Sequence, residues 1–311
     1  MYQTKIRAYA KINLTLEIVG RAGGFHELDS LVASVDVSDT VILKKRKGKL
    51  SSIWMYGQGS ESIPPDKNNA LKAAESYSER FGTDGADVKV LKDIPIGAGM
   101  GGSSADIAGV LLGMQQLYGA ATESELDELA ESLGSDVKYM MRGGFCRMQG
   151  RGEKLTAVGG ELPTLHMLMI CPKEGVSAGG CYREYDCLNE MDEPTGATER
   201  AISALQNGDL QGLCVHLMND LYAPAASLCS AVEKAVEEAR SFSPQGVVMS
   251  GSGSAVLAIF ETAELCRWAK SRYRGKFRTK VLKTVEPQKI KEWRSPFGLT
   301  QEEEKLLKGK E

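Results

Sequence analysis

The first patterned segment of the chain alternates apolar and polar residues from Ile6 to Ile18. A period of two residues predicts a half-buried β-strand, and it places Lys11 and Asn13 next to each other on the polar face. Glycines between residues 20 and 24 then end the pattern. Three further strands are expected, at residues 31–37, 40–44 and 51–56. The chain is therefore expected to begin as a β-meander.

Helical periodicity follows. Apolar residues recur at i, i+3, i+4 and i+7 between Asn68 and Phe81, which predicts an amphipathic helix. A strand at 88–92 precedes a glycine-rich segment, residues 97–104, which leads into a helix with an apolar stripe from Ile107 to Tyr118. We call residues 97–104 the glycine loop. A shorter helix around Leu126–Leu133 and a strand at 143–149 complete the first half.

Turn residues cluster at 159–163, just before a new apolar strand at 165–171. The remaining pattern predicts helices at 198–205, 210–218, 226–239 and 263–270, and strands at 246–249, 255–260 and 277–285. This alternation is typical of an α+β sandwich. We therefore expect two domains, residues 1–160 and 161–286, followed by a charged tail at 287–311.

Composition removes several classes of function. The 38 Lys and Arg against 41 Asp and Glu leave a formal net charge of −3, so the chain has no excess positive charge to attract a nucleic-acid polymer. No apolar run is long enough to cross a bilayer, and the first residues carry no apolar signal core. The seven cysteines and three histidines follow no disulfide or metal-ligand spacing. We expect a cytoplasmic protein with reduced thiols, no membrane contact and no metal held by protein alone.

The glycine loop predicts an anion site. Gly97 to Gly102 matches G-x-G-x-x-G, but no second strand ending in an acidic residue follows, so the dinucleotide interpretation fails. A Walker A loop is also excluded, because Ser103 stands where that motif has lysine. Closely spaced backbone N–H groups and the start of a helix still favour phosphate, and Ser103 and Ser104 add hydroxyls for phosphate or Mg²⁺. The plain alternative is a glycine-rich turn capped by serine.

Three blocks together resemble the GHMP small-molecule kinases. They are residues 95–105, which include the glycine loop, residues 8–14 (Ala-Tyr-Ala-Lys-Ile-Asn-Leu) and residues 249–255 (Met-Ser-Gly-Ser-Gly-Ser-Ala). The resemblance covers about residues 6–285. It implies an α+β fold of two domains: a mixed sheet and helix N-terminal domain that binds ATP, and a ferredoxin-like C-terminal α/β sandwich. It also places the turn at residues 250–254 beside the phosphates, although a plain hairpin loop would have the same sequence character.

The resemblance implies a role for each position that matches the family pattern. The expected ATP-binding residues are Asn68, Lys92, Pro95, Gly97, Ala98, Gly99, Met100, Gly101, Gly102, Ser103 and Ser104, with Mg²⁺ held through the phosphates and Ser104. Asn68 and Lys92 would recognise adenine. Lys11 and Asp136 would be catalytic, Asp136 as the base and Lys11 stabilising its charge. Without the resemblance, Asp136 is more simply a helix N-cap and Lys11 a solvated strand lysine.

On the acceptor side, the turn Gly24-Phe25-His26-Glu27-Leu28 resembles members whose acceptor is a cytidyl-diphosphate sugar alcohol. Phe25 and Tyr182 would then stack on cytosine, His26 would hydrogen-bond its edge and Asn13 would bind the substrate. Phe25 stands where tyrosine is usual, so stacking is kept but a phenol hydrogen bond is lost. Ala178 stands where threonine is usual, which removes one polar contact to the substrate.

Two alternatives stay open. The chain could be another GHMP enzyme, of the homoserine kinase, mevalonate kinase or diphosphomevalonate decarboxylase type, or a catalytically silent ligand-binding homologue. The glycine-flanked aromatic and histidine favour a nucleotide-like acceptor over the first alternative, and intact Lys11 and Asp136 argue against the second. The expected partners are ATP, Mg²⁺ and a small-molecule acceptor, with the protein a monomer or a weak homodimer.

Overall fold

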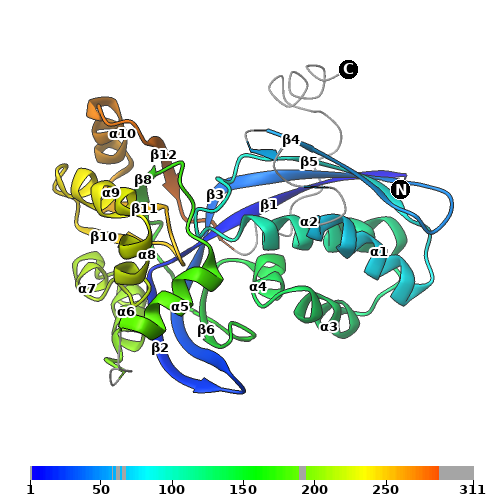
Figure 1. Cartoon of the computed structure of the whole chain (residues 1–311), viewed down its shortest axis with the longest axis horizontal. Helices are drawn as coiled ribbons and strands as arrows, with labels where there is room; N and C mark the ends of the chain where they lie inside the picture. The colour runs from blue at the N-terminus through cyan, green and yellow to red at the C-terminus, as the bar shows by residue number, and fades with distance from the viewer. Residues whose placement is uncertain (1, 58, 61–63, 65–67, 189–193, 287–311) are drawn as a thin grey trace.

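The computed structural model describes residues 2–57, 59–60, 64, 68–188 and 194–286. The predicted tail at 287–311 lies outside the described residues. Two sheets organise the chain, each with helices packed against it, and the first sheet and its helices lie beside the second in Figure 1. The helices and strands mix within each half, as the predicted α+β class requires. No described helix is both long and apolar enough to span a bilayer.

The first sheet has eight strands built around one very long strand, β3 (Phe25–Lys45). Its other strands are β1 (Gln3–Asn13), β2 (Thr15–Ala22), β4 (Ser52–Tyr56), β5 (Ala86–Leu91), β6 (Phe145–Gly150), β7 (Lys154–Ala157) and β9 (Met218–Asn219). β3 pairs antiparallel with β1, β2, β5 and β6 along different parts of its length. β9 comes from the second half of the chain and pairs parallel with β2, which joins the two halves.

Four helices cover one face of this sheet (Figure 1): α1 (Asn69–Phe81), α2 (Gly102–Tyr118), α3 (Glu123–Leu133) and α4 (Val137–Arg142). α2 lies across β1 and β3, and its buried residues join the largest hydrophobic cluster. Gly109 and Gly113, one turn apart, face the sheet. A Cβ at Gly113 would lie 2.2 Å from Leu43 Cδ1, and one at Gly109 would lie 2.7 Å from Val41 Cγ2. These two glycines therefore set how closely the helix approaches the strands.

The second sheet has four antiparallel strands in the order β10-β11-β8-β12. They are β8 (His166–Cys171), β10 (Gly246–Met249), β11 (Val256–Phe260) and β12 (Arg278–Lys283). The helices of this half are α5 (Ala178–Leu188), α6 (Ala197–Gln206), α7 (Leu210–Val215), α8 (Tyr222–Leu228), α9 (Ser230–Arg240) and α10 (Ala263–Arg272). All seven cysteines are free thiols.

Several predicted elements need correction. The strand expected at 6–18 is two strands, because the chain bends at Leu14, where its N–H bonds to the carbonyl of Leu31. The expected meander is wrong, since β1 and β2 both pair with β3 and β3 spans two of the predicted strands. The expected helix at 226–239 is interrupted by Cys229, which is extended. α5 and β7 were not predicted. The division into domains at residue 160 stays a prediction.

The close contact between α2 and the sheet makes a stability test. We expect Gly113→Ala to destabilise the protein by ~1–3 kcal/mol, because the added methyl group collides with the buried Leu43 side chain and this outweighs the gain in helix propensity. The matched control is Gly179→Ala in α5, whose methyl would meet only the tip of Arg183 at 3.5 Å. Urea unfolding measures both, and equal stability of the two variants would contradict the close approach.

Candidate active site

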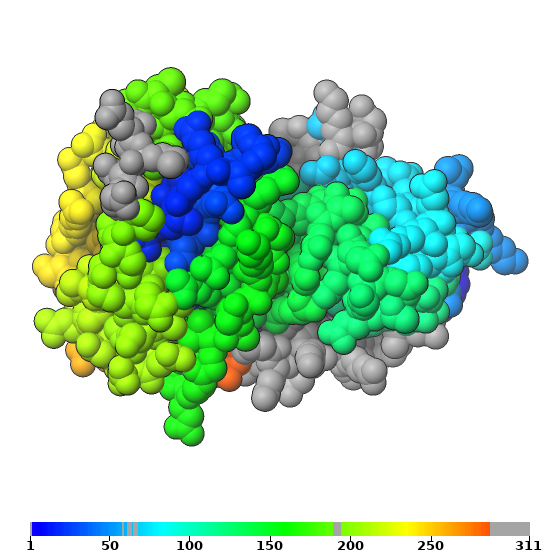
Figure 2. Space-filling view, turned by 90° about the horizontal axis from the view of Figure 1, so that it is seen from below, coloured from blue at the N-terminus to red at the C-terminus, as the bar shows by residue number. Residues whose placement is uncertain are grey.

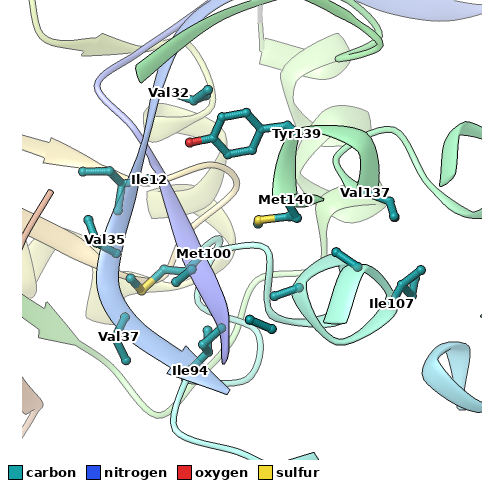
Figure 3. Packing of buried hydrophobic residues seen from close by; sticks show 14 of the residues in the cluster. Ile12, Val32, Val35, Val37, Ile94, Met100, Ile107, Val137, Tyr139 and Met140 are labelled. Atoms are coloured by element: carbon teal, nitrogen blue, oxygen red, sulfur yellow. The ribbon is translucent and has the colours of Figure 1, made fainter. Parts of the chain in front are cut away.

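The glycine loop is anchored to the first sheet. The backbone N–H of Lys11 in β1 donates to the carbonyl of Met100, at 3.1 Å. The Met100 side chain is only 1% exposed, and Figure 3 shows it packed near Ile94 and the β3 residues Val35 and Val37. Since the loop's apolar side chain is buried in the core, its backbone is held at the surface of the sheet.

The turn at residues 250–254, between β10 and β11, closes on the glycine loop from the other side. The Ser250 hydroxyl donates to the carbonyl of Gly99 at 3.0 Å, and the Ala255 N–H donates to the carbonyl of Ala98 at 3.2 Å. A Cβ at Gly99 would lie 2.0 Å from the Ser250 carbonyl oxygen, and one at Gly251 would lie 2.7 Å from the Gly99 carbonyl oxygen. The glycine loop and the 250–254 turn therefore make close backbone contact at Gly99 and Gly251, neither of which has a side chain.

A cavity of about 480 Å³ lies beside the loop, and we call it the first cavity. Each residue expected to bind ATP lines it: Asn68, Lys92, Pro95 and all eight residues of the glycine loop. Asn68 is the N-cap of α1, where its Oδ1 accepts from the Ala70 N–H at 2.9 Å. Its buried Nδ2 makes no hydrogen bond to a described residue. A volume of this size suits a small ligand.

The resemblance implies that Lys92 recognises adenine, but two carboxylates already engage its side chain. Its ammonium is 3% exposed and pairs with Asp39 and, at 2.6 Å, with Asp106. Burial alone would lower the pKa of Lys92, but the charges of Asp106 and Asp39 outweigh it and raise that pKa. Burial also raises the pKa of Asp106 well above its usual range, against the effect of Lys92. A nucleotide would therefore meet the backbone or stem of Lys92, not its charge.

A second cavity, of about 710 Å³, lies on the other side of the loop. It is lined by every residue expected on the acceptor side: Lys11, Asn13, Phe25, His26, Asp136 and Tyr182. Four residues line both cavities, namely Gly99, Gly101, Ala178 and Ser252. The two cavities therefore meet at the glycine loop.

Lys11 and Asp136 face each other where the cavities meet. The Lys11 ammonium lies 3.5 Å from Asp136 Oδ2 and donates to Asn13 Oδ1 at 2.7 Å, so the strand period that placed Lys11 beside Asn13 is confirmed. Lys11 and Asn13 are buried, because the glycine loop and the 250–254 turn cover that face of β1, whereas the Asp136 side chain is 27% exposed. Asp136 is at the N-cap position of α4, yet its side chain makes no capping hydrogen bond to the described helix. Asp136 thus occupies the expected N-cap position without making the hydrogen bond of a capping side chain.

Three aromatic side chains line the second cavity: Phe25, His26 and Tyr182. Phe25, at the tip of the β2–β3 hairpin, is 52% exposed, and the Arg151 guanidinium lies 3.7 Å from its ring centre. His26 stacks on Tyr182 of α5, with 5.0 Å between ring centres. Burial raises the pKa of Tyr182, and the negative charge of Asp136 adds to the rise. Figure 2 shows the hairpin, in blue, against green segments from the middle of the chain.

Metal-binding groups near the glycine loop are few. Among the described residues, no cluster of three His, Cys, Asp or Glu side chains has the geometry of a metal site. Ser103 and Ser104 line the first cavity, and the Asp106 carboxylate one turn on is engaged by Lys92. These residues fit a cation whose main ligands are the phosphates of a nucleotide, with a serine hydroxyl as an additional oxygen.

Comparison with known proteins supports membership of the GHMP kinases. The profile of the GHMP kinases N terminal domain matches residues 68–145, and that of the GHMP kinases C terminal domain matches residues 201–267. A 4-diphosphocytidyl-2-C-methyl-D-erythritol kinase of Caldicellulosiruptor saccharolyticus is 34% identical over 82% of this chain and 87% of its own. The enzyme of that name from Clostridium beijerinckii is 31% identical over 89% of this chain and 100% of its own.

Solved structures agree. A 4-(cytidine 5'-diphospho)-2C-methyl-D-erythritol kinase superposes with a TM-score of 0.74 at 29% identity, over 91% of this chain and 100% of the other. Homoserine kinase from Cytophaga hutchinsonii superposes with a TM-score of 0.70 at 18% identity, over 92% of this chain and 95% of the other, which shows a shared fold. Fold and site together define an ATP-using small-molecule kinase of the GHMP class. Within that class, the chain belongs to the 4-diphosphocytidyl-2-C-methyl-D-erythritol kinase family.

The contact between the glycine loop and the 250–254 turn can be tested at Gly99. We expect Gly99→Ala to cost ~3 kcal/mol or more in unfolding free energy and to lower kcat/KM for ATP by about 10²-fold, because its methyl group collides with a backbone carbonyl. The control is Gly82→Ala: Gly82 has a similar φ, 65° against 71°, but no neighbour within 4 Å of a Cβ.

The control variant carries the backbone strain alone, about 1–2 kcal/mol. Urea unfolding and ADP-release assays measure both variants. Equal losses in Gly99→Ala and Gly82→Ala would show that strain, not the contact with Ser250, limits residue 99.

Proposed function

We propose that this protein transfers the γ-phosphoryl group of ATP to the 2-hydroxyl of 4-diphosphocytidyl-2-C-methyl-D-erythritol, a step in the non-mevalonate synthesis of isoprenoid precursors. The observation that carries the proposal is the meeting of two cavities at the glycine loop, with Lys11 and Asp136 at the junction. One cavity suits ATP and the other suits an acceptor with a nucleotide base. The family membership supports the same acceptor.

Asp136 is the proposed base. Phosphoryl transfer needs an oriented acceptor hydroxyl and positive charge near the migrating group. Asp136 takes the hydroxyl proton as the acceptor oxygen bonds to phosphorus and the bond to ADP breaks. Lys11, 3.5 Å from this carboxylate, keeps it in place and stabilises the developing negative charge. Asn13 fixes the Lys11 ammonium through its Oδ1 and is itself fixed by the Ser30 hydroxyl, 2.8 Å from its Nδ2.

The phosphates of ATP would lie along the glycine loop. Backbone N–H groups there supply hydrogen bonds to an anion without using the side-chain charge that a mildly acidic protein has in short supply. Mg²⁺ would be held by the phosphates and the Ser104 hydroxyl, and when bound it neutralises phosphate charge. The proposed adenine contacts are the backbone of Lys92 and Asn68, whose Nδ2 has no hydrogen-bond partner among the described residues.

The acceptor's base would lie between the hairpin and α5. Phe25 and Tyr182 supply aromatic surfaces for stacking, and His26 supplies a hydrogen-bonding edge. Ala178 offers no hydroxyl where the family has threonine, so one polar contact to the acceptor is missing at the junction of the cavities. We further propose that the protein works in the cytoplasm as a monomer or a weak homodimer.

Acceptor choice is the first test. In a coupled assay of ADP release with purified protein, we expect turnover with the cytidyl acceptor and none with homoserine or mevalonate, because only a nucleotide-like acceptor uses the aromatic end of the second cavity. Turnover of homoserine or mevalonate without turnover of the cytidyl compound would refute the proposed function. If ATP bound but no acceptor caused ADP release, the protein would be a ligand-binding homologue.

The base role is tested by Asp136→Asn. This change keeps the shape of the side chain but removes the proton acceptor, so we expect kcat to fall by about 10²–10⁴-fold while the Kd of ATP is unchanged. The control is Asp127→Asn on α3, an aspartate paired with Arg142 and remote from both cavities, which should keep wild-type kcat. A near-normal kcat in Asp136→Asn would remove Asp136 from the base role.

A further inference from the structure

Side chains on one face of α5 contact His26. Tyr182 stacks on the imidazole at 5.0 Å between ring centres, and Tyr185 meets it edge-on at 5.7 Å. Asp186 Oδ1 lies 2.7 Å from His26 Nε2. These three residues are spaced i, i+3 and i+4, so they share one side of the helix. The helix from the second half of the chain therefore fixes both the plane and the edge of a side chain from the first half.

Arg21 approaches the same carboxylate from the hairpin. Arg21 and His26 are cross-strand partners in the β2–β3 ladder, and both side chains reach Asp186, Arg21 as an ion pair. In this ion pair Asp186 is a carboxylate, and a carboxylate can only accept hydrogen bonds. His26 Nε2 must therefore carry the proton and donate.

The proton on Nε2 decides what the other nitrogen can do. In a neutral imidazole one nitrogen donates and the other accepts, so a proton on Nε2 leaves a lone pair on Nδ1. Nδ1 has no hydrogen bond to any described residue, and His26 lines the second cavity. Cytosine and uracil differ at the 4-position of the ring: cytosine carries an amino donor there and uracil a carbonyl acceptor. The lone pair of Nδ1 attracts the amino group of cytosine and repels the carbonyl oxygen of uracil.

We propose that Asp186 is a positioning residue that fixes His26 as the Nε2–H tautomer, so that Nδ1 accepts from the amino group of cytosine and the site rejects uracil. This inference rests on the proposed function, which puts the acceptor's base in the second cavity. Without Asp186, the imidazole can move its proton to Nδ1 and donate to the carbonyl oxygen of uracil. Asp186 also lines the second cavity, but the role proposed for it is to act on specificity through His26.

The tautomer can be measured without any substrate. ¹H–¹⁵N correlation spectra of the imidazole rings separate the two tautomers, and the chain has only three histidines, His26, His166 and His216. At about pH 8.5, we expect His26 of the wild type as Nε2–H and His26 of Asp186→Ala as a mixture. A wild-type Nδ1–H tautomer or an imidazolium would overturn the proposal.

The matched control is Glu184→Gln. Glu184 lies on the same helix and accepts from the Ser227 hydroxyl at 2.7 Å, a contact that glutamine can keep. This variant removes the same charge from α5 without touching His26. It should leave the tautomer and the acceptor preference as in the wild type. A tautomer change in Glu184→Gln would show that the charge of the helix, not the hydrogen bond from His26, sets the proton.

Specificity is the second readout. We expect Asp186→Ala to reduce the preference in kcat/KM for the cytidyl over the uridyl acceptor by about tenfold, the size of one hydrogen bond, through KM with kcat nearly unchanged. An unchanged preference would refute the role of Asp186. If the wild type turned over neither acceptor, the proposed function and the base preference would fall together, while the spectra would still decide whether Asp186 sets the tautomer.

Discussion

Close backbone contact between the glycine loop and the 250–254 turn is the constraint on which the rest of the structure depends. Each partner comes from a different half of the chain, and Gly99 and Gly251 leave no room for a Cβ at the contact. The Ser250 hydroxyl joins them, because it donates to the Gly99 carbonyl and accepts from the Asn13 N–H at 3.3 Å. Ser250 thereby links the glycine loop, the strand that carries Lys11 and the second sheet. Both cavities share walls at this contact, so their relative position follows from it.

Burial of charge follows one rule throughout the site, which is that each buried charge has a partner from another element. Lys92, which directly follows β5, pairs with Asp39 of β3 and Asp106 of α2. Glu17 in β2 accepts hydrogen bonds from Thr195, Gly196 and Thr198 at the start of α6. Burial alone would raise the pKa of Glu17, but the hydrogen bonds from Thr198 and Thr195 outweigh it and lower that pKa. The ionised carboxylate of Glu17 therefore links the two halves of the chain. Without these hydrogen bonds, burial of its charge would be strongly unfavourable.

Prediction from sequence succeeded where the chemistry is local. The amphipathic helix at α1 and the glycine loop before α2 are strong periodic or compositional signals, and the GHMP motifs brought Lys11, Asp136, Phe25 and His26 together before any geometry was known. Sequence-based prediction failed at α5, because two glycines precede Cys181 and weaken the helical signal. This helix nevertheless supplies the side chains that contact His26. Prediction also missed Asp39 and Asp106, because nothing in the sequence shows which carboxylates a lysine will meet across a sheet.

The sequence by itself determined the α+β class and the backbone chemistry of the glycine loop, because these depend on short-range periodicity and on glycines adjacent in the chain. The kinase family followed from the resemblance of its motifs. Tertiary structure decided which charges are used and which are hidden: Lys11 faces Asp136, whereas Lys92 is enclosed by two carboxylates. It also decided that Asp186 meets His26, 160 residues away in the chain. The physical reason is that ion pairs and hydrogen bonds between distant residues exist only after the strands and helices have packed, and packing is a property of the whole core.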